Sequence, residues 1–301
     1  MIKVAVIGLD TSHSIQFPQR MQDPACAPDQ LVPGMRAVTC LRFETPFQDK
    51  KGLNERQGQL ESWGVRVTTR FEEAVADCDA IMLEINDGAY HLDYFKKVAA
   101  LGKPVFLDKP LAASLDDGRA IIRLMREHKT RVWSGSSIPF CPELNDARSS
   151  FTEIKRAHVF GALGDAPAGD ALVWYGVHTF EMLQRIMGPG ALSVHALETK
   201  NSILSVVDYG AGREGVVEAI RGAWIYGGRI QGLMNKDNKV VPFVCNSAYA
   251  YRDILRLVKA FFEGGATPVD MRTTFEGLAM MTAARQSIET GKAVNVAHLA
   301  E

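Results

Sequence analysis

The segment with the clearest chemical potential is an apolar run that ends in Asp108-Lys109-Pro110. Residues 104–107 are apolar, which is typical of a buried strand in a parallel sheet. In open α/β sheets, ligands bind in the crevice outside the carboxyl ends of the strands, so Lys109 stands where a ligand is expected. A lysine that merely begins a surface loop is the alternative. We favour a functional lysine, because the acidic-Lys-Pro tripeptide ends an otherwise apolar run.

A second candidate is His178, which follows Gly176 and precedes Glu181 by three positions at the start of a predicted helix. A histidine titrates near neutral pH and is able to take a proton from a substrate hydroxyl. A lone histidine is more often structural. The glycine before His178 and the acid after it favour function.

The first predicted strand runs into a turn that partly matches the dinucleotide-binding pattern G-x-G-x-x-G. Gly8 fills the first glycine position, but Asp10 and His13 replace the other two. A carboxylate beside a pyrophosphate is repulsive, whereas Thr11 and Ser12 are possible donors to phosphate at a helix N-terminus. Asp10 as the N-cap of a helix beginning near Thr11 is the alternative interpretation.

Two charged residues follow the second predicted strand, where dinucleotide enzymes recognise the adenosine ribose. Arg42 favours the 2′-phosphate of NADP, and Glu44 favours the ribose hydroxyls of NAD. Solvated surface charge explains either residue equally well. The sequence therefore does not choose between the two cofactors.

The elements that position these residues follow a regular alternation in the first half of the chain. Strand and helix signals alternate up to about residue 137, which predicts a parallel sheet covered by helices on both faces. Ser114 is a predicted N-cap, and residues 23–35 are a predicted surface loop because they contain three prolines and a glycine. The expected strands are 3–8, 36–41, 65–69, 80–85, 104–108 and 131–136, and the expected helices are 71–77, 90–101 and 114–128.

The pattern changes near residue 154, where strands follow one another across short turns. Successive strands with tight connections predict an antiparallel sheet, flanked on one side by helices. We therefore predict a Rossmann-type doubly wound domain over residues 1–138 and an α+β domain over 139–301, with final helices that pack back on the first domain. The expected strands are 155–161, 193–200, 203–209, 215–223, 229–234 and 240–244; turns are expected at 201–202, 210–212 and 235–238, and helices at 178–187, 251–263 and 275–290.

Composition excludes several classes of protein. A chain of 301 residues with 47% hydrophobic residues is long enough for two cores. A net charge of −1 argues against nucleic acid or an anionic membrane as a partner. The first strand begins almost at Met1, so no signal peptide is expected. The five scattered cysteines predict free thiols, no zinc site and a cytoplasmic location.

The two motifs together resemble those of the Gfo/Idh/MocA oxidoreductases. Asp108-Lys109-Pro110 is similar to that family's Glu-Lys-Pro, and Gly176-Val-His178-Thr-Phe-Glu181 is similar to its Gly-x-His-x-x-Asp, each with one acid exchanged. The run from Gly102 and the C-terminal run from Ser287 also resemble the family, so the likeness spans nearly the whole chain. The chain departs from the family at Trp174, where an aspartate is usual, and at residues 86–88, where Thr-Pro-Asn is usual.

The resemblance implies an NAD(P)-dependent oxidoreductase that transfers a hydride to or from a sugar- or polyol-like alcohol. Lys109 would hold the reacting hydroxyl and the cofactor ribose, and His178 would be the acid/base. A homodimer or homotetramer is expected through an apolar face of the second sheet that no helix covers, because the strands that contain Val206, Val216, Ile220 and Ile230 are rich enough in apolar residues for both faces. The predicted cofactor-binding residues are Gly8, Asp10, Thr11, Ser12, His13, Arg42, Glu44, Asn86, His91, Asp108 and Lys109; the predicted substrate-binding residues are Lys109, Trp174, Tyr175, His178 and Glu181.

Three other interpretations stay open. The first is a non-redox ligand-binding or regulatory protein with a degenerate cofactor site, which Asp10 and Trp174 favour. The second is an enzyme of the same fold with redox-neutral lyase or hydrolase chemistry. The third, a metal site, is remote because His13, His91 and His178 lack a recognisable ligand spacing; no metal is predicted.

Overall fold

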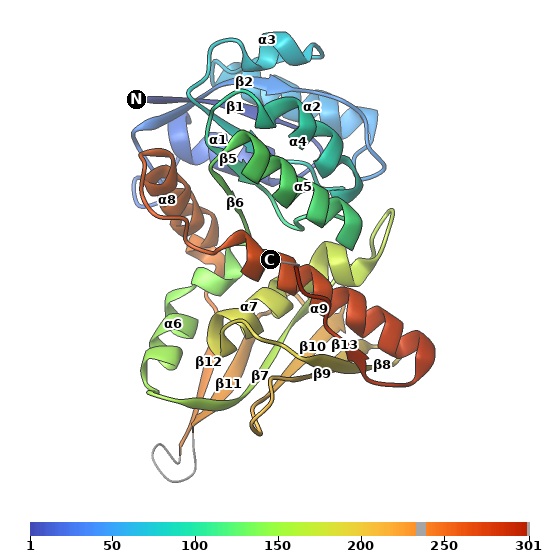
Figure 1. The fold of residues 1–301 in the computed structure, drawn as a ribbon. Coiled ribbons are helices and arrows are strands. Elements are labelled where there is room, and N and C mark those ends of the chain that lie inside the picture. The colour runs from blue at the N-terminus through green and yellow to red at the C-terminus, as the bar shows by residue number, and fades with distance from the viewer. Residues whose placement is uncertain (233–238, 300–301) are drawn as a thin grey trace. The chain divides into compact units, whose positions relative to one another are not determined.

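A computed structural model describes residues 1–232 and 239–299 and divides into two compact units. The first unit contains residues 1–135 and 251–271, and the second contains the remaining described residues (Figure 1). The sequence predicts a single domain boundary near residue 138, so helix 251–263 falls within the predicted second domain, residues 139–301. In the structure this helix belongs to the first unit, whereas residues 272–299 belong to the second.

The first unit is built on a six-stranded parallel sheet with the order β3-β2-β1-β4-β5-β6. This is the strand order of a Rossmann fold, so the predicted fold class is confirmed. The order places the carboxyl ends of β1, β4 and β5 next to one another. The strands are β1 (Ile2–Ile7), β2 (Met35–Leu41), β3 (Arg66–Thr68), β4 (Ala80–Leu83), β5 (Val105–Leu107) and β6 (Val132–Ser134).

Helices cover both faces of this sheet (Figure 1). The hydroxyl of Ser114 accepts a hydrogen bond from the Asp117 amide, so the predicted N-cap is confirmed. Helix α2, between β2 and β3, was not predicted, because its surface is mostly polar. The helices are α1 (His13–Gln22), α2 (Lys50–Ser62), α3 (Phe71–Val75), α4 (His91–Ala99), α5 (Leu115–His128) and α8 (Ala250–Phe262), with a short 3-10 turn η1 (Gly88–Tyr90).

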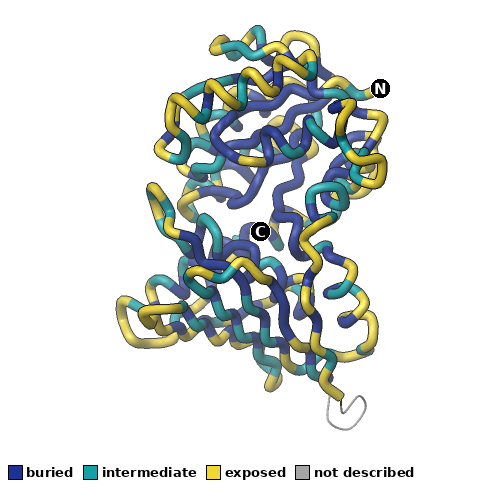
Figure 2. Tube along the Cα trace, turned by 180° about the vertical axis from the view of Figure 1, so that it is seen from behind, coloured by how far each residue is buried: buried dark blue, intermediate teal, exposed yellow. Residues whose placement is uncertain are grey.

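Aromatic side chains connect α8 to this core. The Phe261 ring of α8 lies 6.3 Å from the Trp133 ring of β6, and Trp133 lies 5.1 Å from Phe106 of β5. At the other end of α8, Tyr251 meets the edge of Phe17 in α1 at 6.1 Å. Four of these rings, Phe17, Phe106, Trp133 and Phe261, are fully buried, and burial of each stabilises the fold by roughly 2–3 kcal/mol. Figure 2 shows the buried strands as a continuous dark core.

The second unit is built on a seven-stranded sheet with the order β12-β11-β7-β10-β9-β8-β13. Among the pairings of this second sheet over the described residues, β7–β10 is parallel and the others are antiparallel, so the predicted, mostly antiparallel sheet is confirmed. Met234 and the predicted turn at 235–238 lie outside the described residues. The strands are β7 (Ile154–Leu163), β8 (Ser193–Glu198), β9 (Ser202–Asp208), β10 (Glu214–Arg221), β11 (Gly227–Gly232), β12 (Val240–Val244) and β13 (Val294–Asn295).

Helices cover one face of this sheet (Figure 1). The other face carries Val206, which is 40% exposed, opposite Val216 in the register. Ile220 is half-buried on the same strand as Val216. Ile230 is fully buried and pairs with Ala157, so it faces the helix-covered side of the sheet. The remaining elements are α6 (Pro142–Ser149), α7 (Val177–Met187), α9 (Met271–Thr290), a π-helix η3 (Leu172–Gly176) and the 3-10 turns η2 (Ile138–Phe140) and η4 (Ser247–Tyr249).

Two further features concern the cysteines and the helices. All five cysteines carry free thiols, as predicted. Over residues 1–232 and 239–299, the structure contains no helix with the length and apolarity that a membrane crossing requires.

Candidate functional site

The turn after β1 requires glycine at its first position. Gly8 has a φ of +107°, a region that side chains other than hydrogen rarely adopt. A Cβ atom on Gly8 would lie 2.3 Å from the carbonyl oxygen of Glu84, which follows β4. The glycine therefore lets the backbone after β1 approach the backbone after β4, as the first glycine of a dinucleotide-binding turn does.

Asp10 neither faces an open phosphate site nor caps α1, the two roles that the sequence suggested; it joins two loops. Its carboxylate accepts hydrogen bonds from the Thr45 hydroxyl at 2.7 Å and from the Asn86 amide at 3.0 Å. The residue at the N-cap of α1 is Ser12, so the interpretation of Asp10 as a cap was wrong. Burial raises the pKa of Asp10, and the hydrogen bonds from Thr45 and Asn86 partly offset that effect. Asp10 thus ties the loop after β2 to the loop after β4.

The start of α1 is arranged by short local contacts. The Thr11 hydroxyl oxygen accepts a hydrogen bond from the His13 amide at 3.2 Å, and the Ser14 hydroxyl donates to the Thr11 carbonyl at 2.7 Å. Ser12 is exposed, and its hydroxyl lies 3.5 Å from the hydroxyl of Tyr251. The first turn of α1 holds no acidic residue. This helix N-terminus is therefore electrostatically suited to an anion.

His13, at the third glycine position, points to the carboxyl ends of β4 and β5. Its Nδ1 atom lies 2.8 Å from Asp108 Oδ2 and 3.8 Å from Glu84 Oε2. All three residues are buried, Glu84 completely. Burial and the nearby Asp108 carboxylate raise the pKa of Glu84 well above its usual range. Burial also opposes ionisation of Asp108, but the pairing with His13 outweighs it, and the pKa of Asp108 is lowered.

Lys109 lies in the same group and is only 3% exposed. Its backbone amide donates a 2.8 Å hydrogen bond to Asp108 Oδ1, and its ammonium group interacts electrostatically with Glu84. The Lys109–Pro110 peptide bond is cis. Lys109 is therefore at the carboxyl end of β5, as predicted, and is held among acidic side chains.

Three other predicted cofactor residues, Arg42, Glu44 and His91, differ in their partners and in their burial. Arg42 donates hydrogen bonds to the side chains of Gln57 and Asn54 in α2, so its guanidinium serves inside the domain. Glu44 is exposed. His91 is fully buried, with one ring nitrogen 2.8 Å from the Ile85 carbonyl oxygen; its ring holds the backbone near the end of β4 instead of lining a ligand site.

These observations bear on whether a dinucleotide fits. The Gly8 turn provides the tight bend after β1, and the start of α1 provides the positive helix end that a pyrophosphate requires. The Asp10 carboxylate, the strongest objection from the sequence, is already bound by Thr45 and Asn86. The residues of this turn therefore fit a dinucleotide, with Ser12 as the exposed hydroxyl at the helix start.

The second unit presents His178 within an aromatic group. The His178 ring is 5.1 Å from the Tyr175 ring and 5.6 Å from the Tyr226 ring. Tyr175 also meets the edges of Trp174 at 4.9 Å and of Trp224 at 5.4 Å. Trp224 is 68% exposed, whereas His178 is buried. Trp174 and Tyr175 lie on the π-helix η3, a distortion that is frequent at functional sites.

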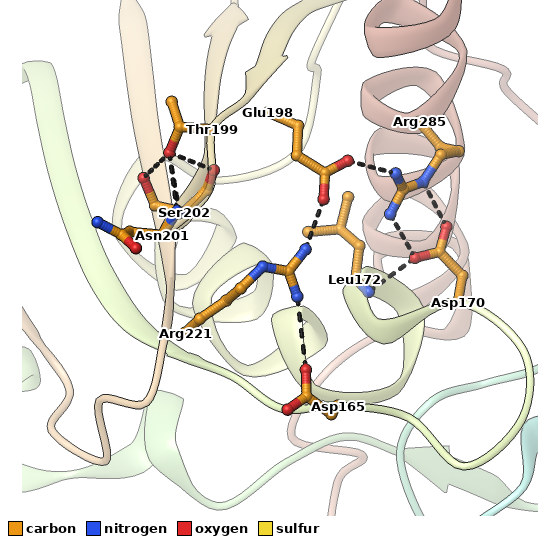
Figure 3. Close-up of polar contacts among 9 residues, drawn as sticks. All are labelled: Asp165, Asp170, Leu172, Glu198, Thr199, Asn201, Ser202, Arg221 and Arg285. Carbon is orange, nitrogen blue, oxygen red and sulfur yellow. Dashed lines mark hydrogen bonds and ion pairs between the residues drawn. The ribbon is translucent and has the colours of Figure 1, made fainter.

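A network of ion pairs fixes the loop that leads into η3 (Figure 3). Arg285 of α9 donates from Nε and Nη2 to both oxygens of Asp170, each at 2.8 Å, and from Nη1 to Glu198 at 3.0 Å. Glu198 also pairs with Arg221. Asp170 in turn accepts a hydrogen bond from the Leu172 amide, at the start of η3. The network therefore anchors the segment that carries Trp174 and Tyr175.

Glu181 is used within the second unit. Its carboxylate accepts a 2.7 Å hydrogen bond from the backbone amide of Ser136. This acid thereby holds the first residue of the unit against α7, and its predicted substrate contact stays a prediction. His178 and Lys109 belong to different units, and their assignment as the catalytic pair stays a prediction.

Comparison with known proteins adds to this geometry. Residues 49–136 match the model of an oxidoreductase family, GFO_IDH_MocA, described as having an NAD-binding Rossmann fold. The matched segment runs from α2 to the end of β6 and includes Glu84, Asp108 and Lys109. The resemblance to the Gfo/Idh/MocA oxidoreductases is confirmed. Because the matched family has an NAD-binding Rossmann fold, the predicted cofactor class, NAD or NADP, is also confirmed.

Solved structures of Gfo/Idh/MocA type share the whole fold with this chain. A putative myo-inositol dehydrogenase from Sinorhizobium meliloti is 16% identical, with a TM-score of 0.76 over 99% of this chain and 100% of that one. The scyllo-inositol dehydrogenase from Lactobacillus casei, solved with NAD(H) and scyllo-inositol, is 13% identical, with a TM-score of 0.78 over 98% and 99%. A probable dehydrogenase from Thermotoga maritima is 16% identical, with a TM-score of 0.78 over 98% and 99%. No match was found among curated protein sequences.

Sequence reasoning missed several residues of these groups. Glu84 is the most important; its signal was an acid within the apolar run Ala80–Ile85, where a charge is costly without a partner. Thr45, Trp224 and Tyr226 carry no local signal, because only the tertiary fold brings them to Asp10 and His178.

Proposed function

We propose that this chain is an NAD(P)-dependent dehydrogenase that acts on the CH–OH group of a sugar- or polyol-like substrate. The observation that carries the proposal is the binding of the Asp10 carboxylate by Thr45 and Asn86, which removes the main objection to a pyrophosphate at the Gly8 turn. The Gfo/Idh/MocA match and the inositol dehydrogenases among the structural neighbours support the reaction class.

Each residue in the proposal has a defined task. The nicotinamide ring, when bound, supplies the hydride acceptor or donor. Ser12 and the start of α1 bind the pyrophosphate, and Lys109 polarises the reacting oxygen by donating a hydrogen bond. Asp108 positions Lys109 by accepting its backbone amide at 2.8 Å. His178 takes the hydroxyl proton during oxidation and returns it during reduction.

The aromatic group around His178 is the proposed substrate-recognition surface of the second unit. The exposed ring of Trp224 and the half-buried Trp174 and Tyr175 offer flat apolar faces, which suit the C–H face of a sugar or polyol. The ion pair between Asp170 and Arg285 holds the start of this segment. These residues define the substrate class of the proposal, not an individual substrate.

A non-redox ligand-binding protein is the second candidate function. The observation that favours it is the third glycine position, which His13 occupies with a ring bound to Asp108. Helix α1 of this chain therefore meets the sheet through the side-chain contact of His13 with Asp108, where glycine would allow direct backbone contact. This candidate predicts ligand binding without turnover of a nicotinamide.

Calorimetric titration of the purified protein with NAD, NADH, NADP and NADPH tests the first requirement. A panel of inositols and sugars is then screened for NAD(P)H formation, and the active substrate is compared across variants. Lys109→Ala should lower turnover by a factor on the order of a hundred or more, because it removes a polarising donor. Its melting temperature is measured alongside, because Lys109 is buried beside Glu84 and its removal also costs stability. Lys51→Ala, at a side chain that is 83% exposed, is the matched control and should keep full turnover. Unchanged turnover in Lys109→Ala would end the assignment.

A further inference from the structure

One buried group of side chains has the composition of a metal site. Nδ1 of His13, one carboxylate oxygen of Glu84 and one of Asp108 all lie within 4.8 Å of one another. They come from the start of α1 and from the residues directly after β4 and β5. The parallel strand order, not sequence spacing, brings them together, so neither their order nor their intervals resemble a metal-binding motif.

Glu84 gives a second, independent observation. The residue is fully buried, and among the described residues neither of its carboxylate oxygens has a hydrogen-bond partner. One of these oxygens, Oε2, is 3.8 Å from His13 Nδ1 and thus faces the group. A buried carboxyl group without a hydrogen-bond partner is unfavourable, and a coordinated cation would supply the missing partner.

The geometry also shows the supporting contacts that metal ligands usually have. The amide of Lys109 holds Asp108 Oδ1, which leaves Oδ2 turned to His13 at 2.8 Å. The His13 ring is held between Phe17 and Tyr251, each at 5.2 Å. Hydrogen bonds and packing of this kind fix the orientation of ligands in metal centres.

We propose that His13, Glu84 and Asp108 bind one divalent transition-metal ion of the zinc class. Metal–ligand bonds of roughly 2.0–2.2 Å put the donor atoms of a small ion about 3–3.5 Å apart, close to the separations of 2.8 Å and 3.8 Å found here. A ligand set of one imidazole and two carboxylates favours such an ion over Mg²⁺ or Ca²⁺, which take oxygen ligands. Three protein donors is also the number found in zinc sites that keep a further position for water or substrate.

The ion would change the electrostatics of the first unit. Asp10, Glu84 and Asp108 place three buried carboxyl groups near the ends of β1, β4 and β5, with Lys109 beside two of them. A divalent cation would offset this negative charge at the same edge of the sheet that is proposed to bind the dinucleotide. The metal proposal does not depend on that function, because it concerns only the three ligands.

The test uses Zn²⁺ itself. Protein dialysed against a chelator is titrated with Zn²⁺ by calorimetry, and metal content after gel filtration is measured by mass spectrometry. We expect one equivalent per chain, a rise in the melting temperature with Zn²⁺, and visible absorption bands with Co²⁺ as the spectroscopic substitute. No binding, or binding without a rise in melting temperature, would overturn the proposal and leave His13–Asp108 as an ion pair only.

Substitutions of single residues identify which side chains bind Zn²⁺. Glu84→Gln and Asp108→Asn keep the side-chain shapes and should each weaken Zn²⁺ binding at least about a hundredfold. Glu276→Gln is the matched control: this buried carboxyl group of the second unit is bonded to the Gly190 amide at 2.9 Å and should bind Zn²⁺ as the unaltered protein does. Cys141→Ser tests the other soft donors, since Cys141 and Cys245 are buried together. Loss of binding in Cys141→Ser with full binding in Glu84→Gln would contradict the proposal.

Discussion

Asp10 Oδ2 accepts a 2.7 Å hydrogen bond from the hydroxyl of Thr45, a residue 35 positions further along the chain. This contact joins the turn after β1 to the loop after β2. The other oxygen, Oδ1, takes the amide of Asn86, so one carboxylate connects three loops at the edge of the sheet.

The first prediction concerns this connection. Asp10→Gly restores the second fingerprint glycine but leaves a buried hydroxyl and a buried amide without their acceptor. We expect the free energy of unfolding to fall by about 2–3 kcal/mol, as measured by urea denaturation. Asp10→Asn, which keeps the shape and one carbonyl acceptor, should lose less. Tighter NAD(P) binding in Asp10→Gly without loss of stability would mean that the carboxylate faces the ligand.

The second prediction compares two glycines. Gly8→Ala forces a Cβ atom to within 2.3 Å of the Glu84 carbonyl oxygen at a φ of +107°. We expect a loss of about 3 kcal/mol or more, because both strain and steric overlap act at one residue. Gly58→Ala in α2 meets no atom within 4 Å and should raise the free energy of unfolding by up to about 1 kcal/mol. Equal effects at the two positions would show that the Gly8 turn is not constrained.

The third prediction is a pH dependence from Asp170. Burial raises its pKa, but the hydrogen bonds from Arg285 and the Leu172 amide outweigh burial, and the net pKa is lowered. A lowered carboxyl pKa gives stability that is present above the unfolded value near 4 and is lost as pH falls through the folded value. Asp170→Asn should therefore reduce the free energy of unfolding by about 1 kcal/mol at neutral pH, with a difference that disappears in acid.

Asp165→Asn is the control for this pH series. The Asp165 side chain is 97% exposed and lies 3.6 Å from Arg221. Asp165→Asn should therefore leave the free energy of unfolding unchanged, within error, at every pH. Stability is measured by urea denaturation at a series of pH values. A difference between Asp170→Asn and the unaltered protein that persists at low pH would refute the assignment to this carboxylate.

The fourth prediction concerns self-association through the open face of the second sheet. Val206 and Val216 face each other across β9 and β10 on that side and line a hollow of about 280 Å³ together with Val240 and the charged Arg156, Glu214 and Arg229. We expect a homodimer or homotetramer in sedimentation velocity. Val206→Lys should weaken association at least about tenfold, whereas Leu101→Lys, at a 38% exposed leucine of the first unit, should not. A monomer at micromolar concentration would contradict the prediction.

Much of the fold follows from local sequence. The apolar run before Lys109 predicts a strand, Gly8 predicts a turn, and Ser114 predicts a helix start. Short-range sterics and hydrogen bonding decide all three. The same reasoning missed α2, whose face toward the sheet uses few apolar residues such as Leu53 and Leu60. Hydrophobic periodicity does not reveal a helix that buries so few apolar side chains.

The sequence by itself determined which segments form strands and which residues stand at their carboxyl ends, because those properties depend on neighbours along the chain. The tertiary structure alone decided what those residues meet. Strand order places β1 between β2 and β4, and β5 next to β4, so Asp10 reaches Thr45 while His13 reaches Asp108 and Glu84. Contacts across 35 or 95 positions arise from strand pairing between distant segments, which no local pattern encodes.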